Sequence, residues 1–451
     1  MTTTTKTSTP SLRIVEGAEA ARADVIARQP FAEIELPEAL QASVTELWGE
    51  PLGAAEHVAR IIAEVAAEGD AAVARYSQRF DGSSYDTVEV SRDEMGEAFA
   101  TVPQEQLDAV EFAVNRVRQY HRAQLEHGPH SFDARGTGMI VRPLQRVGIY
   151  MTGSDAALPS SVIHTAVPGS VAGVDELIGV TAAMPDGRVN PLKLVAARLA
   201  GVHRVFRASG PQAIAALAFG TETIPRVDKI YGPGNIFVTL AKQQMFGRVG
   251  IDAIYGPTET LVIADESARI DLVAADLLAQ AEHDRLSTSV LITNSRKVAE
   301  AVAQEIEVQL ETLERGEIAR AAITRGGAVV VADLNQAVEL ANEFAPEHLC
   351  LLVAEPDELL PQVRHAGGIF VGESSPEVLG DYTAGPSHVM PTGGAARFAS
   401  PLSVLDFLKI TSTVRFDEHE LERQGPYAAL LARSEGLTAH ASSIERRIEG
   451  K

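Results

Sequence analysis

Residues 259–293 read ETLVIADESARIDLVAADLLAQAEHDRLSTSVLIT, and this stretch contains a complete strand–helix–strand unit. Thr260 to Ala264 is a short apolar run, which predicts a buried strand. Apolar residues recur at helical spacing from Ile270 to His283, and Ser289 to Ile292 predicts a second buried strand. Two such strands joined by a helix of this length predict a parallel βαβ unit.

The same alternation continues on both sides of this unit. Ala-rich helical segments at 192–200 and 212–218 separate the strands expected before it. The other predicted strands are 139–142, 146–150, 176–181, 204–207, 229–231, 329–331, 349–353 and 369–371. We therefore expect an α/β fold with two Rossmann-like domains, each built on a parallel sheet of βαβ units.

The ends of the chain have a different character. Helices are predicted from residue 51 to about 80, and from a capping box at Ser91 to about 126, with a break near Pro103. We expect an N-terminal helical arm over residues 1–45 and a C-terminal helical tail over 403–451. The first α/β domain is expected to be discontinuous, comprising 46–149 and 259–402, and the second to comprise 150–258.

Composition excludes several classes of function. The chain has 451 residues, and 39 Lys and Arg stand against 61 Asp and Glu, so its net charge of −22 disfavours nucleic acid as a partner. Its single cysteine, Cys350, excludes a disulfide framework and a Cys-based zinc site. No apolar run approaches the roughly 20 residues that span a bilayer, and the Thr-rich start lacks the apolar core of a signal peptide. We expect a cytoplasmic protein that binds neither membranes nor nucleic acid.

Common catalytic fingerprints are absent: the chain has no G-x-G-x-x-G after a strand, no P-loop, no H-E-x-x-H and no G-x-S-x-G. Gln280 and His283 instead stand at i and i+3 near a helix end, so both can face one ion. Asp381 lies in a Gly-rich loop, and His440 lies in the tail. Each of these residues alone is more often an ordinary helix end, a turn or a surface residue.

Taken together, these four residues make a coherent ligand set. Two imidazoles, a carboxylate and an amide oxygen suit Zn²⁺ better than Mg²⁺ or Ca²⁺. Glu347 and His348 are adjacent at the start of a predicted strand, where a carboxylate and an imidazole can carry protons. The residues thus predict a zinc enzyme with an acid/base pair. They leave open whether it hydrolyses its substrate or oxidises an alcohol.

Several longer segments decide between these chemistries by resemblance. The stretch VGIDAIYGPTE (249–259), which continues to QAEH (280–283), resembles the signature of histidinol dehydrogenases. Further matches in the family's order are KIYGPGN (229–235), APEH (345–348), PTGGAARF (391–398), LSVLDF (402–407) and EGLTAH (435–440).

The resemblance implies an activity and roles for named residues. Family members oxidise L-histidinol to L-histidine through an aldehyde, with two NAD⁺ and one Zn²⁺, as intertwined homodimers whose tails reach the partner's active site. Glu347 and His348 would be catalytic, with His348 taking the hydroxyl proton and Glu347 activating water. The zinc ligands would be Gln280, His283, Asp381 and His440. Residues expected to bind substrate are Thr258, Gln280, His283, His348, Asp381, Glu435 and His440. NAD would contact Tyr150, Gln212 and Asn235 in the second domain, and the first domain would carry the catalytic and zinc residues.

The sequence departs from the family pattern around the expected cofactor and substrate sites. Met151-Thr152-Gly153-Ser154 stands where Pro-Gly-Gly is usual, and Ser209-Gly210-Pro211-Gln212 replaces Gly-Gly-Ala-Gln. Tyr255 replaces a small residue and is expected to narrow a cleft, Thr258 retains the hydroxyl of Ser, and Ser387 replaces Asn. The alternatives are a related zinc and NAD enzyme that oxidises another amino alcohol or a small diol, and a zinc hydrolase.

Overall fold

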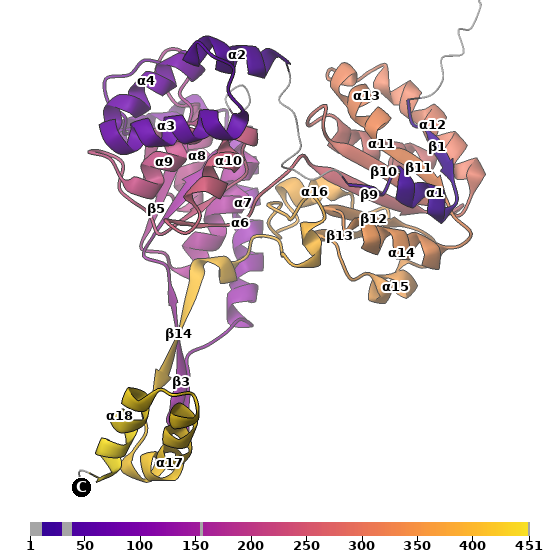
Figure 1. Cartoon of the computed structure of the whole chain (residues 1–451). Helices are drawn as coiled ribbons and strands as arrows, with labels where there is room; N and C mark the ends of the chain where they lie inside the picture. Colours follow the sequence, from indigo (N-terminus) through magenta and orange to yellow (C-terminus); the bar gives the residue numbers. More distant parts are fainter. Residues whose placement is uncertain (1–10, 29–37, 154–156, 450–451) are drawn as a thin grey trace, which may run out of the picture.

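The computed structural model describes residues 11–28, 38–153 and 157–449. Two parallel sheets form the cores of two α/β units that lie side by side, and a helical tail projects away from both (Figure 1). This arrangement confirms the predicted α/β class with two parallel sheets. No helix in the described part of the chain is long and apolar enough to cross a membrane.

The first sheet has the strand order β1-β11-β10-β9-β12-β13, and all its neighbours are parallel. Its strands are β1 (Ile14–Glu16), β9 (Glu259–Ala264), β10 (Thr288–Thr293), β11 (Gly327–Val330), β12 (His348–Leu352) and β13 (Gly368–Val371). One face packs on α11 (Ile270–Ala281), α12 (Arg296–Leu310) and α13 (Gly316–Arg325). The other packs on α1 (Ala18–Ala23), α14 (Leu334–Phe344) and α15 (Pro356–Leu359). β9 and β12 are fully buried because helices cover both faces, which explains their continuous apolar sequences.

The second sheet has the order β6-β5-β4-β7-β8 and is also parallel. Its strands are β4 (Arg146–Tyr150), β5 (Glu176–Thr181), β6 (Arg204–Arg207), β7 (Lys229–Tyr231) and β8 (Gly250–Ile251). One face is covered by α7 (Pro159–Ala172) and α8 (Pro191–Ala200), on which α5 (Arg92–Thr101) and α6 (Gln104–Glu126) pack as an outer layer. The other is covered by α9 (Gly210–Phe219) and α10 (Ile236–Met245), on which α3 (Ala54–Glu68) and α4 (Asp70–Asp81) pack. The predicted break at Pro103 is confirmed, because α5 ends before it and α6 begins after it.

Three predicted boundaries are wrong. The helices of residues 46–149 belong to the second domain rather than the first, because α3 and α4 pack on α9 and α10, and α5 and α6 pack on α7 and α8. The described part of the N-terminal arm is not a free arm, since Ile14–Glu16 pairs with β11 and Leu12 is buried in the first core. The tail does not begin at residue 403, because Phe407 is fully buried in the second core and stacks on Tyr231 with ring centroids 4.0 Å apart.

The tail leaves the second domain on an antiparallel ribbon. β14 (Leu408–Val414) pairs with β3 (Thr137–Pro143), which also pairs with β2 (Phe132–Ala134). Beyond the ribbon, α17 (Glu418–Ser434) and α18 (Thr438–Glu449) pack on each other at the far end of the molecule (Figure 1). α2 (Glu38–Trp48) packs beside α3 on the second domain (Figure 1).

Candidate active site

The predicted catalytic pair lies at the amino-terminal edge of the first sheet. Glu347 directly precedes β12, and His348 is its first residue. β12 is hydrogen-bonded to β9, with His348 in register with Thr260, so Thr258 and Glu259 lie next to the pair. The order of the strands in the sheet also reverses between β9 and β12, because β10 and β11 follow on one side of β9, and β12 and β13 lie on the other. Parallel pairing therefore brings together residues that are distant in the sequence.

The hydrogen bonds of His348 define its chemistry. Its Nδ1 lies 3.0 Å from the carbonyl oxygen of Glu259, and a carbonyl only accepts, so Nδ1 carries the proton and donates. The Nε2 atom then presents a lone pair. It is buried, has no hydrogen-bond partner among the described residues, and lies 3.9 Å from Asp381 Oδ1. A buried imidazole nitrogen held in this tautomer is equipped to take a proton from a bound substrate.

Glu347 is buried beside it in a different environment. Its Oε2 accepts hydrogen bonds from the backbone N–H of Glu259 at 3.0 Å and from the Thr258 hydroxyl at 2.6 Å. Burial raises the pKa of the Glu347 carboxyl well above its ordinary value, although both hydrogen bonds oppose this shift. A carboxylate with a raised pKa is a stronger base, which suits the activation of water.

Three of the four predicted metal ligands surround this pair. Gln280 lies in the last turn of α11, and its Oε1 is 3.0 Å from the Thr258 hydroxyl. Burial lowers the pKa of His283, which keeps its imidazole neutral as a ligand requires. Burial opposes the charge of Asp381, but His388, with Nδ1 3.6 Å from Oδ1, and the other neighbouring histidines lower its pKa overall. An amide oxygen, a neutral imidazole and a carboxylate form a donor set that fits Zn²⁺.

The backbone also favours a cation at this place. α11 ends at Ala281, and α16 (Glu377–Tyr382) ends beside Asp381, so the carboxyl ends of both helices face the site. Helix carboxyl ends carry a partial negative charge, which stabilises a nearby cation.

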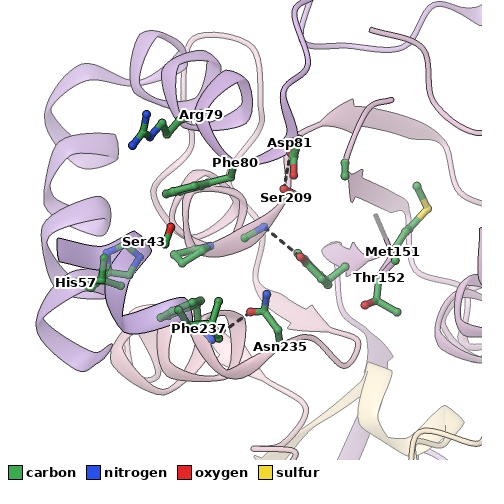
Figure 2. Close-up of a pocket in the computed structure, with 17 residues that line it drawn as sticks. Ser43, His57, Arg79, Phe80, Asp81, Met151, Thr152, Ser209, Asn235 and Phe237 are labelled. Atoms are coloured by element: carbon green, nitrogen blue, oxygen red, sulfur yellow. Dashed lines mark hydrogen bonds between the residues drawn. The ribbon is translucent and has the colours of Figure 1, made fainter. Parts of the chain in front are cut away.

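A second site lies in the other domain, in a cavity of about 480 Å³. It sits at the carboxyl end of β4, the strand between β5 and β7 where the order of this sheet reverses, which is where nucleotides bind in such sheets. Tyr150 lines the cavity, as does Asn235 (Figure 2). The Tyr150 hydroxyl accepts from Gly210 N–H at 3.0 Å, and Asn235 caps α10 through hydrogen bonds from the next turn. Gln212 lies in α9, fully buried, and neither atom of its amide has a partner in the described part of the chain.

The sequence model described as histidinol dehydrogenase matches residues 51–448 of the chain. The chain belongs to the histidinol dehydrogenase family. A histidinol dehydrogenase of Deinococcus radiodurans is 48% identical over 446 residues, which cover 97% of this chain and 100% of that protein. One from Geobacter sulfurreducens is 51% identical over 395 residues, or 86% and 92% of the two chains. The crystal structure of histidinol dehydrogenase from Elizabethkingia anophelis has a TM-score of 0.88 and 31% identity, and the match covers 98% of this chain and 99% of that one.

The two tail residues expected in a histidinol dehydrogenase site lie elsewhere in the single chain. Glu435 and His440 are exposed on the helical tail, which projects away from both sheets (Figure 1). Accordingly, no three His, Cys, Asp or Glu side chains within residues 11–28, 38–153 and 157–449 are grouped so that they alone could hold a metal ion. Within the described residues, the single chain thus brings together three of the four predicted donors, Gln280, His283 and Asp381.

His388 is a site residue that the sequence prediction passed over. Besides approaching Asp381, it stacks on the fully buried His164, with ring centroids 4.4 Å apart. The Ser387 hydroxyl donates to the carbonyl of His164 at 3.0 Å and so fixes the loop. The density of glycines in 380–394 was the available signal, but it does not distinguish a loop that holds a side chain from one that only turns.

The cavity in the second domain is also lined by residues that no motif predicted. α2, α3 and α4 contribute Ser43, His57, Arg79, Phe80 and Asp81 (Figure 2). Burial lowers the pKa of His57 to about 4, so it lines the cavity as a neutral ring that accepts a hydrogen bond from Trp48 Nε1. Sequence reasoning missed them because it assigned α3 and α4 to the wrong domain and placed Ser43 in an N-terminal arm.

Two departures from the family pattern have different structural consequences. Met151, Thr152 and Gly153 line the cofactor cavity, whereas Ser154 lies outside the described residues. Tyr255 is not among the residues that line this cavity. Its ring packs against the second core and lies 4.9 Å from the Lys242 ammonium, whose carboxylate partner is Asp252. The bulk of Tyr255 is thus taken up by packing and a cation–π contact.

Proposed function

We propose that this protein oxidises L-histidinol to L-histidine through L-histidinaldehyde, with NAD as oxidant and Zn²⁺ as metal, in the last step of histidine biosynthesis. The observation that carries this proposal is the Nε2 atom of His348, which has no hydrogen-bond partner among the described residues, is buried beside Glu347 and lies 3.9 Å from Asp381 Oδ1. A biosynthetic dehydrogenase of this kind acts in the cytoplasm on a small molecule.

Each residue of the pair has one task in this scheme. His348 Nε2 takes the hydroxyl proton of histidinol in the first oxidation, because Nδ1 is already committed to the Glu259 carbonyl. Glu347 takes a proton from the water that adds to the aldehyde, and His348 assists the second oxidation. Gln280, His283 and Asp381, together with His440, would hold Zn²⁺, which would supply an orienting charge for the substrate nitrogens. Bound NAD would supply the two-electron acceptor for each oxidation.

NADH formation with zinc-loaded protein and L-histidinol tests the proposal. We expect two NADH per histidine, loss of activity on chelation and recovery on addition of Zn²⁺. If a folded, zinc-binding protein forms no NADH from histidinol, another amino alcohol or a small diol is the substrate. Hydrolysis without NAD would point to a zinc hydrolase instead.

We further propose a homodimer in which the tail of one subunit completes the site of the other. Support comes from the exposed positions of Glu435 and His440, and from the apolar face of α17, where Tyr427, Leu430 and Leu431 are 73%, 65% and 64% exposed. An exposed apolar face of this kind marks an interaction surface. Exchange of identical elements is a simple route to a dimer.

Mixing two inactive variants distinguishes sites shared between subunits from sites within one chain. His348→Asn and His440→Asn should each be inactive alone. In a mixed dimer with exchanged tails, one site combines an unaltered pair with an unaltered His440, so random mixing should restore about a quarter of wild-type activity. Sites formed within one chain would give no recovery.

A further inference from the structure

The main chain of one residue, Glu259, holds both members of the catalytic pair. Its N–H donates to Glu347 Oε2 at 3.0 Å, and its carbonyl accepts from His348 Nδ1 at 3.0 Å. These contacts fix the direction of the Glu347 carboxyl and the tautomer of His348. Any displacement of this peptide segment therefore moves both proton carriers together.

The side chain of Glu259 is held by contacts that do not involve the catalytic pair. It is 6% exposed, and its two carboxylate oxygens bind the guanidinium of Arg28, with Nη2 2.8 Å from Oε2 and a second, shorter contact from Nη1 to Oε1. The N–H of Gly393 also donates to Oε1, at 3.2 Å. Because these donors occupy both oxygens, the carboxylate acts as an anchor and is not available as a base.

Arg28 is the last described residue of the N-terminal segment, residues 11–28. Besides Glu259, it binds α14. Its Nε and Nη2 donate to the carbonyl of Phe344 at 2.9 and 2.7 Å, and its guanidinium lies 4.0 Å from the centre of the Phe344 ring. Phe344 ends α14, three residues before Glu347. The planar fork of an arginine can make these contacts simultaneously, which a lysine cannot do.

We infer that Arg28 and Glu259 are positioning residues for the catalytic pair: the buried ion pair fixes the peptide of Glu259, which in turn orients Glu347 and His348. This inference rests on the proposed dehydrogenase activity. It assigns a role in the chemical step to an arginine of the N-terminal segment that touches neither catalytic side chain.

Arg22 offers a matched control for Arg28. It lies in the same N-terminal segment, and its Nε donates to a carboxylate of α14, Glu343, at 2.7 Å, but no contact links it to Glu259. Arg22→Gln therefore removes an arginine–carboxylate pair that docks the same segment and leaves the peptide of Glu259 in place. We expect its kcat to stay within about twofold of wild type, because exposed pairs contribute little.

The test compares Arg28→Gln, Arg28→Lys and the double variant Arg28→Gln/Glu259→Gln with wild type and Arg22→Gln. In Arg28→Gln, kcat should fall at least about tenfold, since displacements of about 1 Å can cost 10²-fold. The Kd for histidinol should change less than kcat does, because Gln280, His283 and Asp381, three of the expected substrate contacts, belong to other elements. Arg28→Lys should be intermediate, since it keeps the charge and loses the fork. The double variant removes the unpaired buried carboxylate, so it should remain folded and still turn over slowly.

Histidinol that carries deuterium at its carbinol carbon separates positioning from stability. A misplaced base slows the chemical step, so the isotope effect on kcat should rise in the Arg28 variants. A smaller folded fraction lowers kcat and leaves the isotope effect at its wild-type value. An unchanged isotope effect, or a wild-type kcat in the folded double variant, would overturn the inference. Failure of wild type itself to form NADH would overturn the proposed function instead.

Discussion

His348→Asn is the sharpest test of the assigned chemistry, because asparagine can replace Nδ1–H as a hydrogen-bond donor but has no counterpart of Nε2. The amide N–H of asparagine can replace Nδ1–H as donor to the Glu259 carbonyl, so the buried acceptor keeps its partner. The substitution removes Nε2, which is the only nitrogen of His348 free to take a proton. Gln280, His283 and Asp381 are unaltered, so the chain's own donors for zinc remain.

The size of the effect follows from the loss of one general base. Such a group contributes about 10²- to 10⁴-fold to a rate, which is about 3–5 kcal/mol of barrier at about 1.4 kcal/mol per tenfold. The small void left by the ring should lower the free energy of unfolding by about 1–2 kcal/mol. Turnover should therefore fall far more than stability does.

The assay follows NADH at saturating histidinol and NAD, alongside zinc content and the thermal midpoint. His127→Asn is the matched control, because His127 is exposed at the end of α6 and its ring lies 2.9 Å from a backbone carbonyl of its own helix. We expect it to retain wild-type turnover. The reasoning is refuted if His348→Asn keeps more than about a tenth of wild-type kcat, or if its loss of turnover simply parallels a loss of zinc.

Three further variants test other parts of the molecule. Thr258→Val removes the hydroxyl that donates to Glu347, so kcat/KM should fall about 10- to 100-fold in steady-state assays, the value of a hydrogen bond to a charged group. Gln212→Leu replaces an amide that has no hydrogen-bond partner within the described ranges, so it should raise the thermal midpoint and raise the KM for NAD, and an unchanged KM would exclude Gln212 from the cofactor site. Burial raises the pKa of Glu377 from 4.5 to about 7, so the folded protein binds this proton more tightly than the unfolded chain does. Its contribution to stability is thus fully present below pH 4.5 and is lost as the pH rises to about 7, by about 3 kcal/mol. Glu377→Gln should then be the more stable protein in urea titrations at pH 8, and equal sensitivity of both proteins to pH would contradict the assignment.

The strands of both sheets were predictable from the sequence because of their environment. β9 and β12 are covered by helices on both faces, so each is a continuous apolar run in the sequence. Such a run can be recognised as a strand without knowing which strands lie next to it. β1 has only three residues at a sheet edge, which is too short to produce such a signal. Its place in the first sheet depends on pairing with β11, more than 300 residues later.

The amphipathic helices show where sequence reasoning stops. α3 and α6 each carry one apolar face, and that pattern predicts a buried face without saying which element buries it. In the structure α3 packs on α9 and α10, and α6 packs on α7 and α8, so the predicted assignment to the first domain was wrong. The cofactor cavity residues on α3 and α4 were missed for the same reason.

The candidate site likewise has features that the sequence determines and features that only the tertiary structure determines. The sequence determines which functional groups the site contains: a Glu-His pair with imidazole, carboxylate and amide donors. It does so because each amino acid carries the same functional group wherever it lies in the fold. Which nitrogen of His348 is free, the raised pKa of Glu347 and the anchoring of Glu259 by Arg28 all depend on contacts between segments far apart in the chain. Local sequence thus determined the strands and the reactive groups. Only the tertiary structure decided the orientation, protonation and support of those groups, because these are set by burial and by hydrogen bonds that form when distant segments pack together.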